Sequence, residues 1–240
     1  MRIDCKNLDH KALNEAIASC EDQQVHLVNC LGQRYIGCGL SDKSIEIDGT
    51  PGNALGAYMN GATVRVFGNG QDAIGDTMND GSIYIHGSCG DATGYAMRGG
   101  KIFVKGDIGY RAGIHMKAYQ DKIPAVIVGG NAGSFLGEYQ AGGHIVVLGL
   151  GVENQPRVGF FCGTGIHGGK IYLRMNEAPK NLPLQVASRK ATKEDLAEIK
   201  GYIEEFSKEF GADYQKIMSH QFIVLTPNTK NPYKQLYTNH

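Results

Sequence analysis

The chain has 240 residues, and its 24 basic and 24 acidic side chains give a formal net charge of zero. Because a nucleic-acid-binding surface shows as an excess of Lys and Arg, this balance argues against a nucleic-acid partner. Glycine is abundant, at 34 residues, while 42% of the residues are hydrophobic and only 20% are charged. This composition disfavours a disordered chain and favours a fold with many tight turns.

Cysteine spacing and hydropathy favour a cytoplasmic protein. The six cysteines form no CxxC pair, and no secretory signal precedes them. We therefore expect reduced thiols rather than a disulfide framework. No segment approaches the roughly 20 consecutive apolar residues that span a bilayer, so we expect no membrane partner.

Residues 1–24 are predicted to form a strand and a helix that cap the region after them. Residues 2–5 are typical of a short strand, and Asp9 stands where a helix N-cap belongs. Apolar residues recur at helical spacing over residues 10–20, so we predict a short amphipathic helix there. Its apolar face can cover the exposed end of a repeat fold.

Residues 25–175 are organised by a 19-residue repeat. It begins imperfectly at Val25, runs through four copies without a gap from Ser44 to Tyr119, and has a further copy at residues 125–143. A fixed period near 20 residues is typical of repeat architectures. Two glycine columns and one methionine column define the register: Gly49, Gly68, Gly87, Gly106 and Gly130; Gly56, Gly75, Gly94, Gly113 and Gly137; and Met59, Met78, Met97 and Met116.

Each copy opens with alternating residues, as in Ile45 and Ile47 on either side of Glu46. Alternation of period two places the apolar set on one face of a strand and the residues between them on the other. A 19-residue repeat with one short strand and several glycine bends predicts a mainly β fold, a parallel β-helix of about seven coils. We interpret the methionine column as packing in its interior.

Residues 176–240 are predicted to form a connector, a helix and a tail. The proline-containing stretch before Thr192 is poor in strand signals, and Thr192 caps a helix that ends at Phe210, just before a glycine. The apolar stripe of this helix packs on the repeat region or faces another subunit, and we favour the first. We also expect a shorter helix near Asp213 and a strand at residues 222–227, followed by an extended tail.

No motif predicts a catalytic, cofactor or metal site on this chain. Residues 163–168 match the letters GxGxxG, but a strand follows them in place of the helix that a dinucleotide site needs. Acidic residues such as Asp76 and Asp91 do not recur in one column, so we interpret them as turn residues rather than as a glycosidase pair. Cys162 and His167 stand five residues apart, without a third group that would complete a nucleophilic site.

The glycine pattern resembles that of a known family. The run from Gln33 to Gly37, the repeated G-xx-G-xxx-G spacing and the closing turn GTGIHGG at residues 163–169 are similar to the GXGXG domain of glutamate synthase, which is C-terminal in its large subunit. One copy departs from the spacing, with Gln71 where the middle glycine belongs. The resemblance implies a right-handed β-helix without catalytic residues, here as a free-standing chain.

The same resemblance implies a non-catalytic scaffold subunit of a multi-chain glutamate synthase. Its partners would be glutamine amidotransferase and FMN-dependent synthase subunits, and FMN and iron–sulfur clusters would be bound by those partners, with no cofactor on this chain. Two alternatives stay open: a scaffold subunit of a complex like formylmethanofuran dehydrogenase, and an independent carbohydrate-active β-helix enzyme. A homo-oligomer is also open.

We expect the interaction surface to lie where the repeat is interrupted. These places are the run from Gln33 to Gly37, the insertion after Tyr119, the long turn at residues 149–169 and the terminal helix. The candidate interface residues are Arg34, Tyr35, Arg157 and His167.

Overall fold

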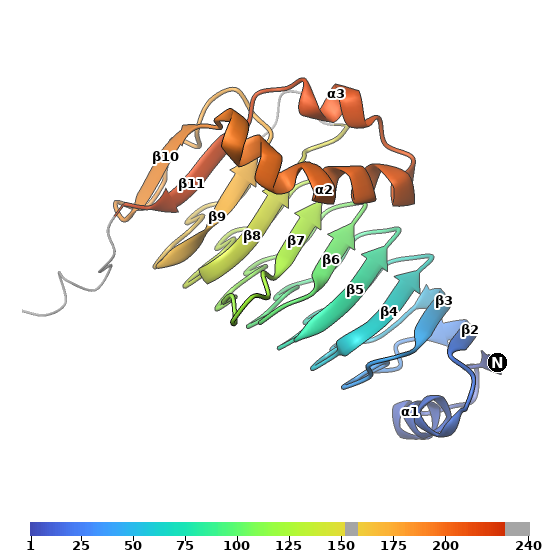
Figure 1. Ribbon diagram of the computed structural model, residues 1–240. Coiled ribbons are helices and arrows are strands. Elements are labelled where there is room, and N and C mark those ends of the chain that lie inside the picture. Colours follow the sequence, from blue (N-terminus) through green and yellow to red (C-terminus); the bar gives the residue numbers. More distant parts are fainter. Residues whose placement is uncertain (152–157, 229–240) are drawn as a thin grey trace, which may run out of the picture.

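The computed structural model describes residues 1–151 and 158–228, which form one open sheet of eleven strands (Figure 1). The strand order is β1-β2-β3-β4-β5-β6-β7-β8-β9-β11-β10, and the first nine strands are parallel. The helices are α1 (His10–Ser19), α2 (Lys193–Phe210) and α3 (Tyr214–Met218). The strands are β1 (Arg2–Asp4), β2 (Gln24–Leu31), β3 (Ser44–Thr50), β4 (Asn60–Val66), β5 (Asp80–Ile85), β6 (Lys101–Val104), β7 (Ala125–Val128), β8 (Ala141–Val147), β9 (Gly168–Leu173), β10 (Val186–Lys190) and β11 (Ile223–Pro227).

Neighbouring strands are aligned by the sequence repeat. Ile45 pairs with Val64, and Val64 pairs with Ile83, so paired residues lie 19 positions apart in the chain. These three side chains are fully buried, whereas Glu46 on the alternate face of β3 is exposed. The alternation therefore directs a ladder of apolar side chains into a core between the sheet and the crossovers that connect its strands.

The prediction of a right-handed parallel β-helix of about seven coils is wrong. The structure is a single open sheet, mostly parallel, to which each copy of the repeat contributes one strand. The rest of each copy folds as turns, and neighbouring crossovers are joined by separate backbone hydrogen bonds, such as that from the Gly56 N–H to the Ile36 carbonyl (2.8 Å). Only the alternating apolar segment stays extended for several consecutive residues, so the glycine-rich remainder forms no further sheet in the described ranges.

The methionine column lies in the core beside the crossovers. All four side chains are fully buried, among residues such as Leu55 and Ile74. An unbranched thioether side chain adapts to an irregular interior, which explains its use at this position of the turns. The four residues are Met59, Met78, Met97 and Met116.

Helix α2 lies across the other face of the sheet, on the side opposite the crossovers (Figure 1). Ile199, Ile203 and Phe206 are buried against this face, where they join Phe103 and Ile127 in a second apolar cluster. The apolar stripe of the helix therefore packs on its own chain.

The predicted helices are confirmed, although α1 ends at Ser19, one residue before the predicted limit. The Thr192 hydroxyl accepts a hydrogen bond from the Asp195 N–H, and Gly211 ends α2 in the left-handed conformation (φ 70°). Asp9 caps α1 by accepting from the Ala12 N–H (2.8 Å), and Asp213 caps α3. Each of these caps is a contact between residues close in sequence, which is why the pattern of letters reveals it.

Strand β10 was not predicted, because it lies in the stretch interpreted as a connector poor in strands. It pairs antiparallel with β11, which in turn pairs antiparallel with β9. The strand predicted at residues 222–227 is confirmed as β11, whereas the tail from residue 229 onward lies outside the described residues. The division of the chain at residues 24 and 175 stays a prediction.

The two glycine columns have different physical causes. Gly56 represents the second column, whose members all have φ between 65° and 74°, the left-handed region that glycine enters without strain. Gly87 represents most of the first column, and its φ lies outside that region. A Cβ at Gly87 would instead collide with the Asn69 side chain and with the Gly68 carbonyl of the neighbouring crossover. A positive φ is therefore what the second column requires, whereas most of the first column requires glycine because a Cβ has no space there.

Side chains next to the first column form a ladder between crossovers. The Asn69 Oδ1 accepts a hydrogen bond from the Ser88 N–H (2.9 Å), and the Ser88 Oγ accepts from the Asp107 N–H (3.0 Å). The Asp107 Oδ1 then accepts from the Asn131 N–H (2.6 Å). These bonds satisfy backbone donors that no strand ladder reaches, and they bring the side chains so close that only glycine fits beside them.

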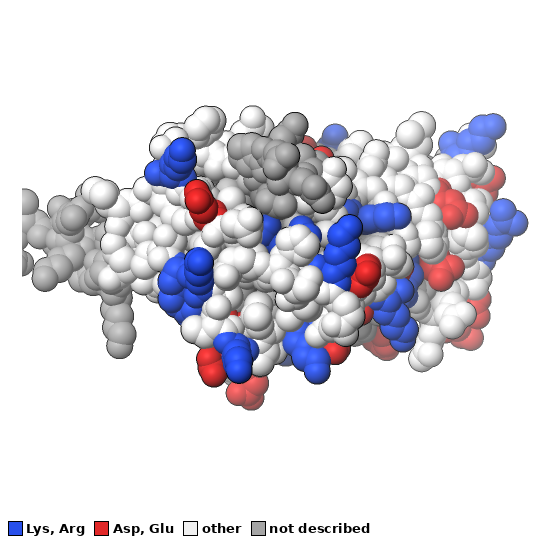
Figure 2. Space-filling view, turned by 90° about the horizontal axis from the view of Figure 1, so that it is seen from above, with Lys and Arg blue, Asp and Glu red and all other residues white. Residues whose placement is uncertain are grey.

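The face that carries α2 and α3 shows basic and acidic side chains interspersed over its described residues (Figure 2). This agrees with the zero net charge of the chain. Within residues 1–151 and 158–228, no helix combines the length and the apolar character that crossing a bilayer requires.

Candidate functional site

Three of the four predicted interface residues lie in the described ranges, and they are not brought together. Arg34 and Tyr35 follow β2, and both are exposed; Tyr35 is 48% exposed. His167 immediately precedes β9, at the other end of the row of crossovers, and is half-buried. Arg157 lies outside the described residues.

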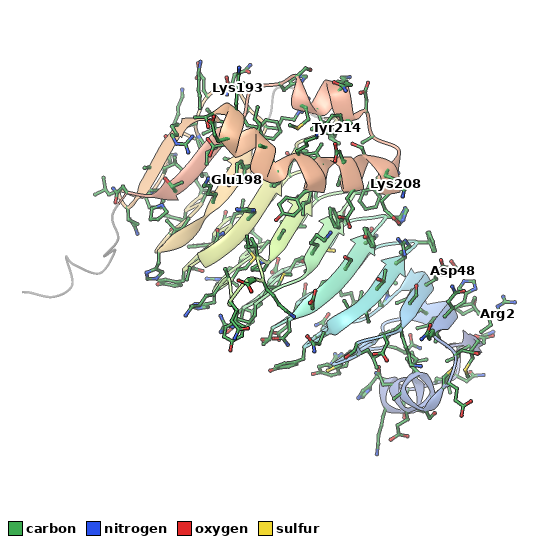
Figure 3. All side chains as sticks on the ribbon, viewed as in Figure 1. Arg2, Asp48, Lys193, Glu198, Lys208 and Tyr214 are labelled. Atoms are coloured by element: carbon green, nitrogen blue, oxygen red, sulfur yellow. The ribbon has the colours of Figure 1, made fainter. Side chains whose placement is uncertain are left out.

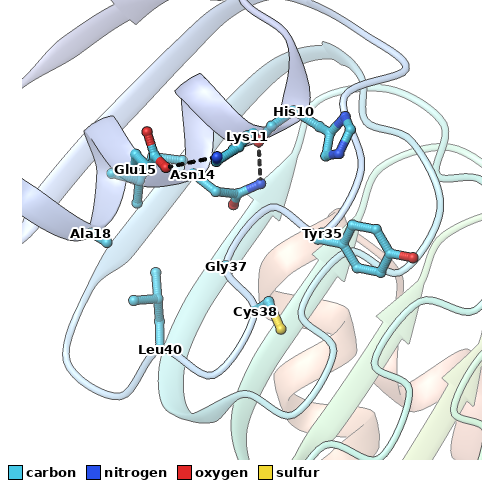
Figure 4. Close-up of a pocket in the computed structure, with 10 residues that line it drawn as sticks. His10, Lys11, Asn14, Glu15, Ala18, Tyr35, Gly37, Cys38 and Leu40 are labelled. Carbon is cyan, nitrogen blue, oxygen red and sulfur yellow. Dashed lines mark hydrogen bonds and ion pairs between the residues drawn. The ribbon is translucent and has the colours of Figure 1, made fainter.

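Tyr35 borders an open pocket of about 430 Å³ between α1 and the turn at residues 35–40 (Figure 4). His10 and Tyr35 lie at one end of this pocket, and Ala18 and Leu40 lie at the other. The Asn14 Nδ2 joins the two sides by donating to the carbonyls of His10 (2.7 Å) and Arg34 (2.9 Å). The helix thus fixes the turn that carries Arg34 and Tyr35.

Tyr35 belongs to a row of residues that share one repeat position and a left-handed backbone. Their φ values lie between 56° and 62°, which is unusual for residues other than glycine. Four strand spacings separate Tyr35 from Arg111, or roughly 19 Å at about 4.8 Å each. The row consists of Tyr35, Ala54, Ala73, Ala92, Arg111, Phe135 and Phe161.

The last three members of this row stack on one another. The Arg111 guanidinium lies 4.8 Å from the centre of the Phe135 ring, and the Phe135 and Phe161 rings are stacked with centres 5.0 Å apart. Phe161 is 55% exposed and its neighbour Phe160 is 65% exposed. Four aromatic or guanidinium groups therefore lie together at the surface instead of in a core.

A second stack runs beside the first. The Tyr95 and His115 rings meet edge to face with centres 6.0 Å apart, and the His115 and Tyr139 rings are stacked at 5.2 Å. Glu138 connects the two stacks, because its carboxylate accepts from the Arg111 Nε (3.2 Å) and its backbone carbonyl accepts from the His115 N–H (2.9 Å). We call this region the aromatic surface, and it comprises Tyr95, Tyr110, Arg111, His115, Phe135, Tyr139, Phe160 and Phe161.

Part of the aromatic surface stands on a left-handed backbone, which has an energetic cost; the residues concerned are Arg111, His115, Phe135, Tyr139 and Phe161. A left-handed conformation costs on the order of 1–3 kcal/mol for a residue other than glycine, and such strain concentrates at functional sites. Hydrogen bonds to the next crossover maintain it here, from the Arg111 N–H to the Ser134 carbonyl (2.9 Å) and from the Phe135 N–H to the Phe160 carbonyl (2.8 Å). Bulky side chains at strained positions are a reason to look for a binding role.

His167 lies close enough to His115 for the two imidazoles to interact. Burial lowers the pKa of His167 below its ordinary value, and the nearby His115 lowers it further, since two positive charges repel. His167 is therefore mostly neutral at pH 7. Through His115, this predicted interface residue adjoins the aromatic surface.

The residues considered for chemistry have structural partners. The Asp76 Oδ1 accepts from the Thr77 hydroxyl (2.8 Å), and the Asp91 Oδ1 accepts from the Tyr110 N–H of the next crossover (2.8 Å). Cys162 is buried, and burial raises the pKa of its thiol to about 12. In the described part of the chain, no three His, Cys, Asp or Glu side chains are grouped as a metal ion requires.

Several ionisable side chains meet between α2 and β9. The nearly buried Asp195 carboxylate accepts hydrogen bonds from Arg189, from Lys170 (3.1 Å) and from the Thr192 N–H (2.8 Å). Glu198 lies on the side of α2 that faces the strands (Figure 3), where it accepts from Lys170 and from the Tyr172 hydroxyl (2.6 Å). These contacts fasten the helix to the sheet.

The aromatic surface was missed by sequence reasoning, although one signal was available. Phe135 and Phe161 occupy the same repeat position in successive copies, and Tyr110 and Phe160 share the position just before it. An apolar side chain repeated at a turn position is unusual, because turn positions face solvent.

The chain is similar to known proteins in sequence and in fold. The family model for the GXGXG motif matches residues 22–228. An uncharacterized protein of Methanocaldococcus jannaschii is 45% identical over 249 aligned positions, which cover 98% of this chain and 95% of that protein. Among solved structures, the fold is similar to a chain of the formyltransferase/hydrolase complex from Methylorubrum extorquens, determined in complex with methylofuran. The TM-score is 0.64 at 19% identity, with 95% of this chain and 96% of that chain covered, which shows a shared fold.

Proposed function

The chain belongs to the GXGXG motif family, and on this basis we propose that it is a structural subunit of a multi-chain glutamate synthase. The family match agrees with the resemblance to the C-terminal GXGXG domain of glutamate synthase. In this proposal the chain holds a glutamine amidotransferase subunit and an FMN-dependent synthase subunit. FMN and iron–sulfur clusters are bound by the partners, and this chain contributes shape and binding surface.

The observation that carries the proposal is the aromatic surface. Tyr, Phe and Arg are enriched in the cores of protein interfaces, where large rigid side chains bury much area at little conformational cost. Phe160 and Phe161 provide such groups, and Arg111 is held flat on the Phe135 ring. Strained backbone positions maintain this arrangement before any partner binds, which reduces the entropy lost on association.

Purification of the tagged chain from its native cells tests the subunit role. We expect an amidotransferase chain and a flavoprotein synthase chain to co-purify with it, as identified by mass spectrometry. A fully active glutamate synthase reconstituted from those two chains alone would contradict the proposal.

A matched pair of substitutions tests the surface. Phe161 and Tyr58 are both 55% exposed and both left-handed, with φ of 60° and 56°, but Tyr58 lies outside the aromatic surface. Asn tolerates this backbone conformation, so Phe161→Asn and Tyr58→Asn should both fold. We expect Phe161→Asn to weaken partner binding at least about 10-fold and Tyr58→Asn to leave it unchanged. Equal effects of the two changes would show that partners bind elsewhere.

The fold likeness favours a second candidate, a structural subunit of a complex of the formyltransferase/hydrolase or formylmethanofuran dehydrogenase kind. The same purification separates the two candidates. Recovery of a formyltransferase, or of a molybdenum or tungsten enzyme, in place of the amidotransferase and the flavoprotein would favour the second.

A further inference from the structure

Two thiol groups meet where the first strand joins the sheet. Cys5 directly follows β1, and its N–H donates to the Val28 carbonyl in β2 (2.9 Å). Cys30 lies near the end of β2, and the side chains of Cys5 and Cys30 are 0% and 3% exposed. The two thiols interact with each other, so they lie in the same part of the core.

The backbone explains why the two side chains share one face. Asp4 pairs with Val28, so a regular strand would place Cys5 beside Asn29. Asn29 instead has a left-handed φ of 56°, and the register of β2 shifts between Leu27 and Cys30. Such a bulge redirects the residue that follows it, here towards the core that holds Cys5.

Gln33 holds the pair from the other side. Its Nε2 donates to the Cys5 carbonyl (2.9 Å), and its Oε1 accepts from the Cys30 thiol (3.4 Å). One side chain therefore spans both cysteines and limits how far they can move apart.

We propose that Cys5 and Cys30 form a disulfide bond when the protein meets a small-molecule disulfide, and that this bond locks β1 onto the sheet. One thiolate attacks the oxidant, which forms a mixed disulfide and releases one small thiol. The other cysteine then attacks the mixed disulfide, which forms the Cys5–Cys30 bond and releases the second small thiol. The two protein thiols are oxidised, the oxidant is reduced to two thiols, and the two cysteine protons pass to the released thiolates.

The reaction is coupled to opening of β1. Burial raises the pKa of Cys5 and raises that of Cys30 to about 12, so few thiolates exist while the strand is closed. β1 has three residues and lies at the edge of the sheet, where local opening requires little free energy. Opening exposes both thiols and the edge of β2, which could then pair with another strand. The disulfide prevents that exposure.

Oxidation of the folded chain by glutathione disulfide tests the proposal. In a Cys20→Ser, Cys38→Ser background the two thiols that are not buried are removed, which leaves Cys5, Cys30 and two further buried cysteines. We expect a mass loss of about 2 Da, a peptide that links Cys5 to Cys30, and a rise of roughly 5 °C or more in Tm that dithiothreitol reverses.

Cys5→Ala in the same background is the control, because alanine keeps a small apolar side chain in the core. We expect it to show neither the linked peptide nor the rise in Tm. A Cys20→Ser, Cys38→Ser chain that stays reduced, or whose Cys5–Cys30 link leaves Tm unchanged, would overturn the proposal. The proposal would also be overturned if glutathione disulfide raised the Tm of the Cys5→Ala variant by the same amount.

Discussion

Gly87 illustrates how one residue can determine the spacing between two crossovers. The Asn69 side chain and the Gly68 carbonyl occupy the space that a Cβ at Gly87 would need. The Asn69 side chain cannot move away cheaply, because its Oδ1 satisfies the Ser88 N–H. The absence of a side chain at Gly87 is therefore part of the hydrogen-bond ladder.

Gly87→Ala should lower the free energy of unfolding by about 2–4 kcal/mol, since it forces apart two crossovers or breaks their hydrogen bond. Gly201→Ala is the control, because Gly201 lies in the middle of α2 with open space around it. That change should stabilise the protein by about 0.5–1 kcal/mol through helix propensity. Chemical denaturation measures the free energy of unfolding of both variants. Equal values for Gly87→Ala and Gly201→Ala would contradict the steric argument.

Gln140 interrupts the methionine column with a polar side chain. It is fully buried, and its Nε2 donates to the carbonyls of Gly142 (3.2 Å) and Gly143 (3.0 Å). Its Oε1 accepts no hydrogen bond in the described structure. The amide is thus retained as a donor to two carbonyls at the start of β8.

Gln140→Glu should therefore cost about 3 kcal/mol or more, because it removes the donor and places a carboxyl group in an apolar core. Gln140→Met keeps a similar volume and introduces no charge, so it should lower the free energy of unfolding by less than Gln140→Glu does. Thermal unfolding of both variants at pH 7 makes the comparison. If Gln140→Glu and Gln140→Met lost the same stability, only the lost hydrogen-bond donor would matter.

At the scale of elements, α2 is held by charges as well as by its apolar stripe. Its carboxylates meet strand residues along the helix: Asp195 and Glu198 meet Lys170 in β9, and Glu209 meets Arg65 in β4. One helix therefore spans strands distant in sequence. Removing a carboxylate at one end should loosen that end first.

The Asp195 carboxyl gives this contact a pH dependence. Hydrogen bonds from Arg189 hold the pKa of Asp195 well below its usual range, despite the opposing effect of burial. A lowered pKa in the folded state stabilises the protein above the unfolded pKa near 3.8, and this stabilisation is lost as the pH falls through the folded value. Asp195→Asn should cost about 2 kcal/mol at pH 7 and flatten the fall of Tm below about pH 4.

Tm measured between about pH 2 and pH 7 for the wild-type protein and for Asp195→Asn tests this. Glu204→Gln is the matched control, because Glu204 forms an exposed pair with Lys200 in the same helix (3.6 Å). Its effect should stay within about 0.5 kcal/mol. If Tm fell with pH in Asp195→Asn as it does in the wild-type protein, carboxylates other than Asp195 would control the acid transition.

Elements with local signals were predictable, and elements that depend on distant pairing were not. The caps at Asp9 and Thr192 involve residues three apart, so both helices were located correctly. β10 forms because β11, more than 30 residues later, supplies an edge with which it pairs. The repeat predicted one strand per copy, but its glycine-rich part folds as turns and not as the further sheets of a β-helix.

The candidate site was predicted in part for the same reason. Tyr35 and His167 were identified from breaks in the repeat, and His167 adjoins the aromatic surface through His115. Phe135 and Phe161 are brought into contact by the stacking of crossovers, which a single copy of the repeat does not reveal.

At the scale of the whole molecule, burial is uneven along the sheet. All four side chains of β7 are buried, because the crossovers cover one face and α2 covers the other. β3 is buried on one face only, and Glu46 and Asp48 on its other face are exposed. Since each of the first nine strands pairs mainly with its neighbours in sequence, the ends of the sheet can open without disturbing its middle.

Hydrogen exchange should therefore be slowest in β6 to β8 and at least about 10-fold faster in β1 to β3. Phe206→Ala removes a buried ring of α2 that contacts Gly129 after β7, and it should cost about 3–5 kcal/mol. Mass-spectrometric exchange on this variant should show faster exchange in β6 to β8, while β1 to β3 keep their rates. Equal acceleration in all strands would mean that the sheet opens as a single cooperative unit, and that α2 stabilises its distant end as strongly as the strands it covers.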